Sequence, residues 1–304
     1  MKIEKIDSKI EWQKITSKSN YYNLLSSPDF FEGLTCPHDF IVLKNNTDLL
    51  LSCVIFKKEK FKEKYFFQDF NYNQGIYFLI DDKKKQLEAT SFLLNELTKN
   101  YDQLRFSLNY NFYDIRAFQW HDYPRCEFKF NTVYSSIINL DKGLDDVFSK
   151  FRYSRRREKK LFDKSDYKIQ SSQDFEKFCE IYSRVYKKIL GNFVINTHLK
   201  LIKNSFKNNF SRLNLVIKNK QILGGTIFYY DNQNAYYAFS VLEKVKENFS
   251  LATPLIIEQL EHFNSKDVKN IDMMGINSPG RGDFKESFGG GIKSFYEVTY
   301  EKKK

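Results

Sequence analysis

Two apolar segments occur once in each half of this chain, in the same order. LLLSCVIF (49–56) is followed by TSFLLNEL (90–97), and QILGGTIF (221–228) is followed by TPLIIEQL (253–260). The first segment of each pair is typical of a buried strand, and the second has the apolar spacing of a helix. We interpret this repeat as a duplication of one α+β unit. Chance similarity between apolar strands is the alternative.

The other segments repeat the same order of elements. In the first half we expect a helix at 10–25, a short helix after Ser27-Pro28-Asp29, strands at 39–45, 48–57, 76–80 and 104–109, and a helix at 85–99. In the second half we expect strands at 213–218, 222–230, 234–242 and 271–276, a helix at 251–263 and a final strand from Ile292. We therefore predict an α+β fold with two subdomains at 1–145 and 146–304, each a mixed, mostly antiparallel sheet flanked by helices.

Composition excludes several classes of protein. Of the 304 residues 41% are hydrophobic and 17% aromatic, which is enough for a packed core. Apolar runs are far shorter than the roughly 20 residues of a membrane-spanning helix. The N-terminus has no signal-peptide core, so we expect a cytoplasmic protein. The net charge of +11 favours anionic partners, with a merely lysine-rich surface as the alternative.

Cysteine and histidine are few and scattered. The four cysteines contain no C-x-x-C pair, and the four histidines lie far apart in the sequence. This spacing predicts no metal site and makes structural thiols the default for Cys36, Cys53, Cys126 and Cys179.

The most basic segment lies between the two halves. FSKFRYSRRREKKLFDKSDYKI (148–169) has aromatic and leucine residues that share a helical face, so we predict an amphipathic basic helix that opens the second subdomain. Its clustered cations repel one another, and a bound anion would explain them. A solvated helix is the alternative.

A third feature lies near the C-terminus, in IDMMGINSPGRGDFKESFGGGIKSF (271–295). Three of the chain's 12 glycines are consecutive there, at 289–291. Glycine lets the backbone approach a ligand or another strand closely, and a nearby lysine can stabilise negative charge. A plain turn before an edge strand explains the glycines equally well. No G-x-S-x-G, P-loop or dinucleotide fingerprint occurs in the chain.

Three segments carry a resemblance to a known family: 154–160 (SRRREKK), 224–262, and 271–290 with its F-K-x-x-F-G pattern. In their order and spacing they resemble the Fem-like acyltransferases of the GNAT superfamily. That group includes the aminoacyltransferases of peptidoglycan cross-bridges and proteins encoded with polysaccharide genes. The resemblance implies two GNAT-like subdomains in which two central strands splay apart to admit an acyl donor.

The resemblance also implies roles for individual residues. Lys285 matches the family's catalytic-site lysine and would stabilise the oxyanion as an amine attacks an acyl carbonyl. Asp283 and Asp272 are the candidates for accepting the amine's proton. The candidate substrate-binding residues are Arg155, Arg156, Lys159 and Lys160, which would face phosphate, together with Tyr237, Ser240, Asn277 and Phe284.

We therefore expect an acyltransferase that acts on an amine of a cell-envelope sugar or peptidoglycan precursor. Acyl-CoA is the favoured donor, although the loop at 243–250 lacks the glycines that usually hold the CoA pyrophosphate. The nearest alternative is an aminoacyl-tRNA donor, and a non-catalytic protein that binds anions or nucleic acid on a GNAT scaffold is the alternative of another class. The expected acceptor is nucleotide- or lipid-linked, which implies peripheral contact with the anionic inner face of the membrane. We expect no metal cofactor and no stable protein partner.

Overall fold

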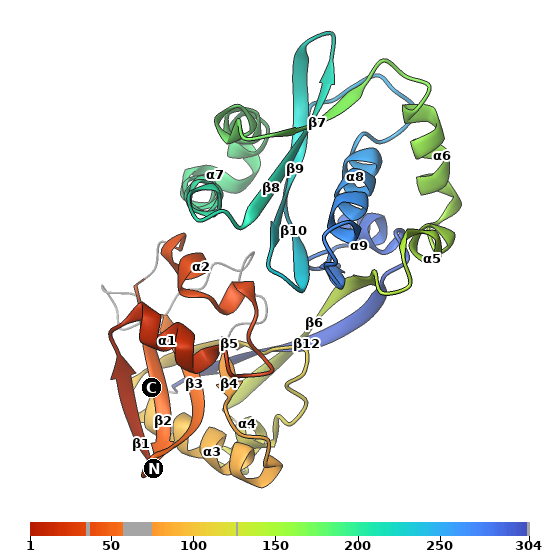
Figure 1. The fold of residues 1–304 in the computed structure, drawn as a ribbon. Helices are drawn as coiled ribbons and strands as arrows, with labels where there is room; N and C mark the ends of the chain where they lie inside the picture. Colours follow the sequence, from red (N-terminus) through yellow and green to blue (C-terminus); the bar gives the residue numbers. More distant parts are fainter. Residues whose placement is uncertain (35–36, 57–74, 126, 303–304) are drawn as a thin grey trace. The chain divides into compact units, whose positions relative to one another are not determined.

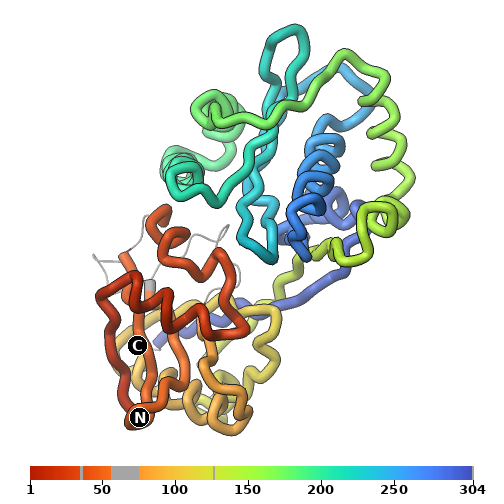
Figure 2. Tube along the Cα trace, in the orientation of Figure 1, coloured from red at the N-terminus to blue at the C-terminus, as the bar shows by residue number. Residues whose placement is uncertain are grey.

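The computed structural model describes residues 1–34, 37–56, 75–125 and 127–302. The chain forms two compact units. Unit 1 comprises residues 1–31, 35–133 and 294–304, and unit 2 comprises 32–34 and 134–293. Figures 1 and 2 follow the chain through both units. This division differs from the boundary predicted at residues 145 and 146, because the last eleven residues group with the N-terminal part of the chain.

Unit 1 contains a four-stranded antiparallel sheet and the pairing of β5 (Gln103–Ser107) with β12 (Gly291–Glu301). The sheet has the order β1 (Lys2–Ile6), β2 (His38–Asn45), β3 (Asp48–Phe56) and β4 (Ile76–Phe78). β5 pairs with the end of β12 in antiparallel register. The helices are α1 (Lys9–Thr16), α2 (Pro28–Glu32), α3 (Lys83–Asn100) and α4 (Arg116–Trp120), with a 3₁₀ turn at Leu24–Ser26.

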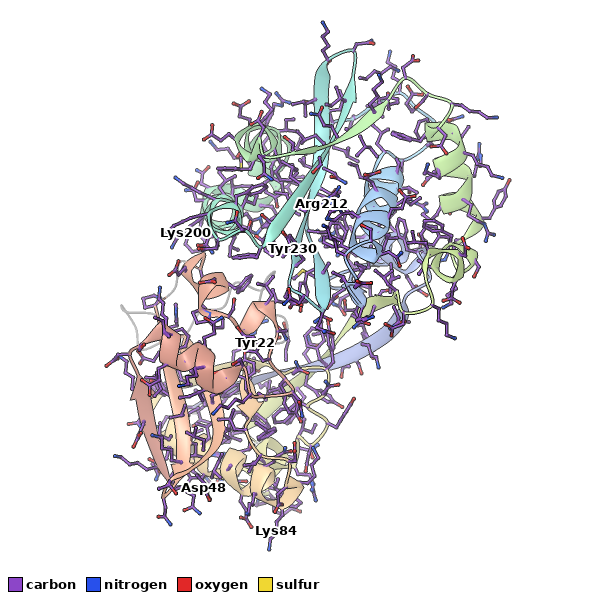
Figure 3. All side chains as sticks on the ribbon, in the orientation of Figure 1. Tyr22, Asp48, Lys84, Lys200, Arg212 and Tyr230 are labelled. Carbon is purple, nitrogen blue, oxygen red and sulfur yellow. The ribbon has the colours of Figure 1, made fainter. Side chains whose placement is uncertain are left out.

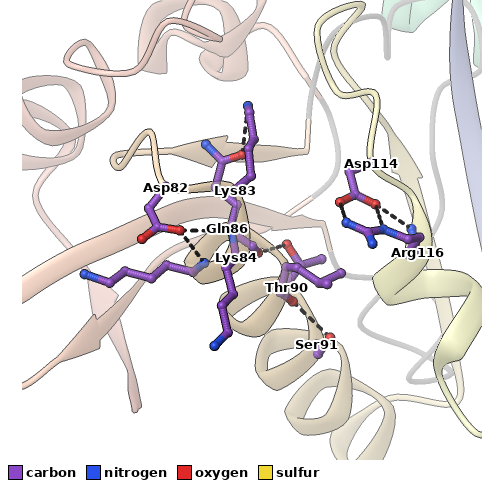
Figure 4. Close-up of polar contacts among 10 residues, drawn as sticks. Asp82, Lys83, Lys84, Gln86, Thr90, Ser91, Asp114 and Arg116 are labelled. Carbon is purple, nitrogen blue, oxygen red and sulfur yellow. Dashed lines mark hydrogen bonds and ion pairs between the residues drawn. The ribbon is translucent and has the colours of Figure 1, made fainter.

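Aromatic packing forms the core of unit 1. Trp12 of α1 is fully buried and stacks on Phe40 of β2 with ring centroids 4.7 Å apart. Helix α3 begins where Asp82 accepts hydrogen bonds from the backbone N–H groups of Lys84 and Lys85, at 3.0 and 3.1 Å (Figure 4). This N-cap satisfies amides that the helix itself leaves unpaired.

Unit 2 contains six neighbouring strands of an eight-stranded sheet, and helices cover both of their faces. Their order is β6 (Phe128–Asn139), β11 (Asn270–Asp272), β10 (Asn234–Leu242), β9 (Gln221–Tyr230), β8 (Ser211–Lys218) and β7 (Lys168–Ser172). α7 (Phe175–Lys207) lies on one face, with a kink at Gly191, and α8 (Ala252–Asn264) lies on the other (Figure 1). The remaining helices are α5 (Leu144–Ser149), α6 (Tyr153–Phe162) and α9 (Pro279–Glu286).

The side of the sheet that faces α8 carries most of the core of unit 2. Phe228, Ile256, Phe263 and Phe288 are all at most 1% exposed within one cluster. At the edge of this layer Arg212, labelled in Figure 3, donates a 2.8 Å hydrogen bond to Gln259 of α8. Burial of such aromatic and aliphatic side chains, each worth roughly 1.5–3 kcal/mol, fixes α8 on the sheet.

The sheet topology confirms two tandem α+β units. The two predicted repeats fall on β3 and β9, and on α3 and α8. In each unit four antiparallel strands in sequence order precede that helix, and a further strand follows it. The next strand in sequence, β6 after unit 1 and β12 after unit 2, pairs with a strand of the other unit. β6 follows β5 in sequence but pairs with β11 of unit 2, whereas β12 follows β11 and pairs with β5 of unit 1.

Several predicted elements have different bounds. The single helix predicted at 148–169 is wrong, because α5 and α6 are separated at Arg152, whose extended backbone donates its N–H to Ser287 O at 2.9 Å. The strand predicted at 271–276 ends at Asp272, and the helix predicted at 10–25 ends at Thr16. β6, α7 and α9 were not predicted from the sequence.

Two thiols can be placed. Cys53 and Cys179 are thiols that form no disulfide, and burial raises the pKa of the Cys179 thiol to about 12. Cys36 and Cys126 lie outside the described residues. Across the described ranges no helix is both long and apolar enough to cross a membrane.

Candidate active site

The site in unit 2 begins where two neighbouring strands part. β10 and β11 pair in parallel over Asn234–Tyr236 and Asn270–Asp272 only. β10 then continues beside β9 to Leu242, with a register shift between Tyr237 and Phe239. The pairing of β10 with β11 therefore ends after three residue pairs.

The chain after β11 forms a tight turn. Met274 and Gly275 both have positive φ, at 51° and 79°, which ends the strand. A carboxylate oxygen of Asp272 accepts hydrogen bonds from Met274 N at 2.7 Å and from the Ser135 hydroxyl at 2.5 Å. The same hydroxyl oxygen accepts Gly275 N at 3.1 Å. Asp272 and Ser135 thus fix the turn, and Asp272 is only 4% exposed.

Lys285 reaches this turn from α9. Its ammonium donates to Met274 O at 2.7 Å and to Gly275 O at 3.1 Å, and lies 5.3 Å from the centre of the Tyr237 ring. An ammonium has three N–H donors, so one is left for a substrate. Burial lowers the pKa of Lys285 to about 8, and Arg281 adds to the lowering while Asp272 opposes it.

Helix α9 is held against the turn by close packing. A Cβ at Gly282 would lie 2.2 Å from Ile276 O, so only glycine allows the helix to approach this near. Phe288, just after α9, is fully buried against Phe151 and Phe284. Lys285 therefore projects from a helix with little freedom to move.

Two of the three consecutive glycines are explained by contacts of the same kind. A Cβ at Gly289 would lie 2.5 Å from the Cβ of Lys150, and one at Gly290 would lie 2.3 Å from Ser136 Oγ. From the sequence we expected these glycines to let the backbone approach a ligand or another strand closely. The neighbours they approach are α5 and β6.

Arg155 is committed to a network inside the protein. Its guanidinium lies 2.9 Å from Glu158 and 3.0 Å from the Thr253 hydroxyl, which donates to Glu158 at 2.5 Å. The side chains of Arg155 and Glu158 are only 13% and 15% exposed. The guanidinium also lies over the Phe284 ring at 4.8 Å. This network covers the N-terminus of α8, where Thr253 is fully buried.

The other predicted basic residues differ in availability. Lys159 pairs with Asp163 at 2.6 Å, and Arg156 donates to Ser149 O at 3.2 Å. Arg157 and Lys160 are exposed, and within the described ranges neither has a hydrogen-bond or ion-pair partner. Among the described residues, the charge of α6 that no carboxylate pairs is therefore carried by Arg156, Arg157 and Lys160.

Asp283 points away from the turn. Its side chain is 67% exposed and pairs with Arg152, which also contacts Glu286 at 3.4 Å. Arg152 thereby links the start of α6 to α9.

The remaining candidates lie on β10 and in the turn. Tyr237 is 9% exposed, and burial raises its pKa to about 12 although a hydrogen bond with Ser240 opposes the rise. Ser240 O accepts the Tyr186 hydroxyl of α7 at 3.3 Å. Asn277 binds the backbone of Tyr134 through both amide atoms, at 2.8 and 3.2 Å.

The structure thus brings Lys285, Asp272, Tyr237 and Phe284 together, whereas Asp283 and Lys159 face outward. Sequence reasoning missed Ser135, Glu158 and Thr253, which orient these groups. Their roles leave no signal in the sequence, because the hydrogen bonds of Ser135 with Asp272 and of Thr253 with Glu158 span 137 and 95 residues. Among the described residues no three His, Cys, Asp or Glu side chains form a group that could hold a metal.

Comparisons with solved structures identify the fold. No protein-family model and no curated protein sequence matches the chain. The structure is similar to the crystal structure of FemX, with a TM-score of 0.67 and 11% identity over 97% of both chains. It is also similar to a tandem GNAT protein from the clavulanic acid biosynthesis pathway, with a TM-score of 0.57 and 9% identity over 99% of this chain and 98% of that one.

A third similar structure is the C-terminal domain of a putative lysylphosphatidylglycerol synthetase from Agrobacterium fabrum, with a TM-score of 0.56 and 8% identity over 96% of this chain and 92% of that one. These similarities show that the chain has a Fem-like, tandem GNAT fold, as the sequence resemblance implied.

Proposed function

We propose that this protein is an N-acyltransferase with its catalytic centre at Lys285. The main support is the ammonium of Lys285, which is held by two consecutive carbonyls of a rigid turn at the point where β10 and β11 part. A preorganised donor in a partly desolvated site can stabilise negative charge much more strongly than one in water. The fold shared with GNAT proteins is consistent with this reaction.

In the proposed reaction a neutral amine of the acceptor attacks the carbonyl carbon of an activated acyl group. The carbonyl π electrons move to oxygen, and the third N–H of Lys285 binds the resulting oxyanion. The new ammonium loses one proton, the tetrahedral intermediate collapses to an amide, and the departing donor oxygen or sulfur takes up a proton. Lys285 must be charged for this role.

The two candidate carboxylates have different proposed roles. We propose that Asp272 is a positioning residue, because its carboxylate fixes the two carbonyls that hold Lys285. Asp283 pairs with Arg152 at the surface and would transfer a proton only after releasing that guanidinium. We therefore assign proton removal from the amine to solvent.

The donor can be argued from the N-terminus of α8. In the GNAT pattern that we considered, CoA pyrophosphate binds at the loop before this helix. Here the loop at 243–250 has no glycine, and the first turn of α8 is covered by Arg155 and Glu158. This favours an aminoacyl-tRNA donor over acyl-CoA. The exposed pair Arg157 and Lys160 and the net charge of +11 suit such a polyanion.

For the acceptor we propose an amine of a nucleotide- or lipid-linked cell-envelope precursor. The phosphate of that precursor would bind basic residues of α6, and a lipid-linked form would bring the protein to the inner face of the membrane. No side chain discriminates between the two forms, so both belong in the assay.

The experiment is a transfer assay with ¹⁴C-labelled aminoacyl-tRNA and acetyl-CoA as alternative donors. We expect Lys285→Ala to reduce kcat at least about 100-fold, and Lys285→Arg to retain part of it because the charge remains. Both variants should keep the circular dichroism spectrum of the wild type. Unchanged turnover in Lys285→Ala would remove this lysine from catalysis.

The same assay tests the alternative of a non-catalytic binding protein. In that case neither donor is consumed, and Arg157→Glu with Lys160→Glu abolishes tRNA binding while Lys285→Ala leaves it intact. Efficient transfer from acetyl-CoA would instead overturn our choice of donor and leave the role of Lys285 standing.

A further inference from the structure

A second cavity lies in unit 2, away from the turn that holds Lys285. It has a volume of about 380 Å³ and lies between α5, the end of β6 and the start of β12. Its lining includes Ile137, Val147, Asn139, Asn270, Lys150 and Lys293. A volume of this size is within the range of small-molecule sites, which is roughly 300–1,000 Å³.

This cavity is separate from the candidate active site. Asn270 is the first residue of β11, whereas Lys285 binds the carbonyls of Met274 and Gly275 beyond the end of that strand. Neither Lys285 nor the two residues whose carbonyls it binds, Met274 and Gly275, line the cavity. None of the residues that we place in the reaction lines the cavity.

The lining combines an apolar floor with positive charge. Ile137 and Val147 supply the floor, and the amides of Asn139 and Asn270 are joined by a 3.3 Å hydrogen bond beside it. Lys293 has no hydrogen-bond or ion-pair partner among the described residues. Lys150 pairs with Asp146 at 2.6 Å, but its side chain is 50% exposed, and exposed pairs of this kind are weak enough to exchange for a ligand.

Gly291 is the member of the glycine run that close packing does not explain. A Cβ there would meet only Ile137 O, at an ordinary 3.9 Å, and its φ is not positive. Gly289 and Gly290, by contrast, have no room for a side chain. A side chain at position 291 would project beside the cavity that Gly291 lines.

We propose that this cavity is a second binding site, for a small organic anion that has a carboxylate or phosphate group and an apolar body. The anionic group would bind Lys293 and Lys150, the apolar body would contact Ile137 and Val147, and the absence of a side chain at Gly291 keeps the entrance open.

Titrations monitored by NMR of isoleucine δ1-methyl groups in the full chain test this site. The probes are benzoate and phenyl phosphate, with benzyl alcohol as the neutral control. We expect saturable shifts of the Ile137 and Ile138 methyl signals with at least one anion. The anion that binds more tightly shows whether the site prefers a carboxylate or a phosphate. Absence of shifts with both anions, or equal binding of benzyl alcohol, would overturn the proposal.

Variants connect the shifts to the cavity. Gly291→Val should abolish the methyl shifts. Lys293→Gln should raise the Kd of the anion roughly 10-fold, as expected for loss of one charge-assisted hydrogen bond. Lys142→Gln removes the same charge from a nearby residue outside the lining and should change nothing. If Gly291→Val disturbs the fold, Lys150→Gln with Lys293→Gln decides the matter, because full binding by that double variant contradicts the site.

Discussion

At the scale of single residues, the pKa of Lys285 determines a pH dependence. Its value of about 8 means that the ammonium is charged below this pH and neutral above it. Oxyanion stabilisation by the charged form therefore predicts that kcat falls as pH rises through about 8. Lys285→Arg should move this alkaline limb beyond the measurable range, because a guanidinium stays charged. A kcat that instead rises to a plateau above pH 8 would indicate that Lys285 acts as a base.

The same pKa has a consequence for stability. Between about pH 8 and the ordinary value of 10.5, unfolded Lys285 binds a proton that the folded residue does not. This group alone therefore makes the free energy of unfolding increase with pH across that window. Lys285→Met removes the dependence while keeping most of the apolar side chain. Urea denaturation of the wild type and of Lys285→Met at pH 7.5 and pH 10 measures this dependence. If the free energy of unfolding changes equally with pH in the two proteins, the lowered pKa is contradicted.

Asp272 and Asp283 form a matched pair of carboxylates for mutation. Asp272→Asn weakens charge-assisted hydrogen bonds in a buried turn and should cost about 1–3 kcal/mol of folding free energy. It should also lower kcat and move the alkaline limb to lower pH, because the Asp272 charge opposes the lowering of the Lys285 pKa. Asp283→Asn breaks only an exposed ion pair and should cost at most about 1 kcal/mol. Equal losses in chemical denaturation would show that the turn does not depend on Asp272.

At the scale of elements, α9 offers two glycines with opposite expectations. Gly282→Ala places a Cβ 2.2 Å from Ile276 O, which must push the helix from the turn. We expect a loss of at least about 2 kcal/mol and a strong reduction in kcat. Gly280→Ala meets nothing within 4 Å, has no positive φ, and should stabilise the protein by about 0.4–1 kcal/mol. Thermal melting of the two variants provides the comparison.

Elements whose pattern is local were predicted well from the sequence. β10 was predicted with its observed bounds, and α8 within one residue at each end. Helix α9 was not predicted, because Gly280 and Gly282 are unfavourable residues inside a helix. The break before α6 likewise depends on Ser287, far away in sequence.

The sequence likewise indicated only part of the candidate site. The F-K-x-x-F-G resemblance located Lys285, and the structure adds the carbonyls that hold it. Arg155 was grouped with phosphate-binding residues because its partners Glu158 and Thr253 cannot be recognised from charge alone. A cluster of cations in sequence does not indicate which of them are already paired after folding.

At the scale of the whole molecule, the exchange of β6 and β12 determines how the chain can be divided. A fragment of residues 1–145 lacks the segment Glu297–Glu301 that pairs with β5. Truncation after Lys293 should therefore increase hydrogen exchange in residues 103–107 of unit 1. Truncation after Lys302 keeps every pair of β12 with β5 and serves as the control. Unchanged protection in the shorter chain would mean that β5 does not need its partner.

The pairing of β5 with β12 also bears on how the protein is made. Glu297 and Ser107 are partners in adjacent strands across 190 residues of chain, so the ribosome must synthesise all of unit 2 before this ladder can close. Until then the nascent first unit has an open strand edge, the kind of surface that chaperones protect and that promotes aggregation. The synthesis of β12 thus sets the moment at which the open edge of β5 can be covered.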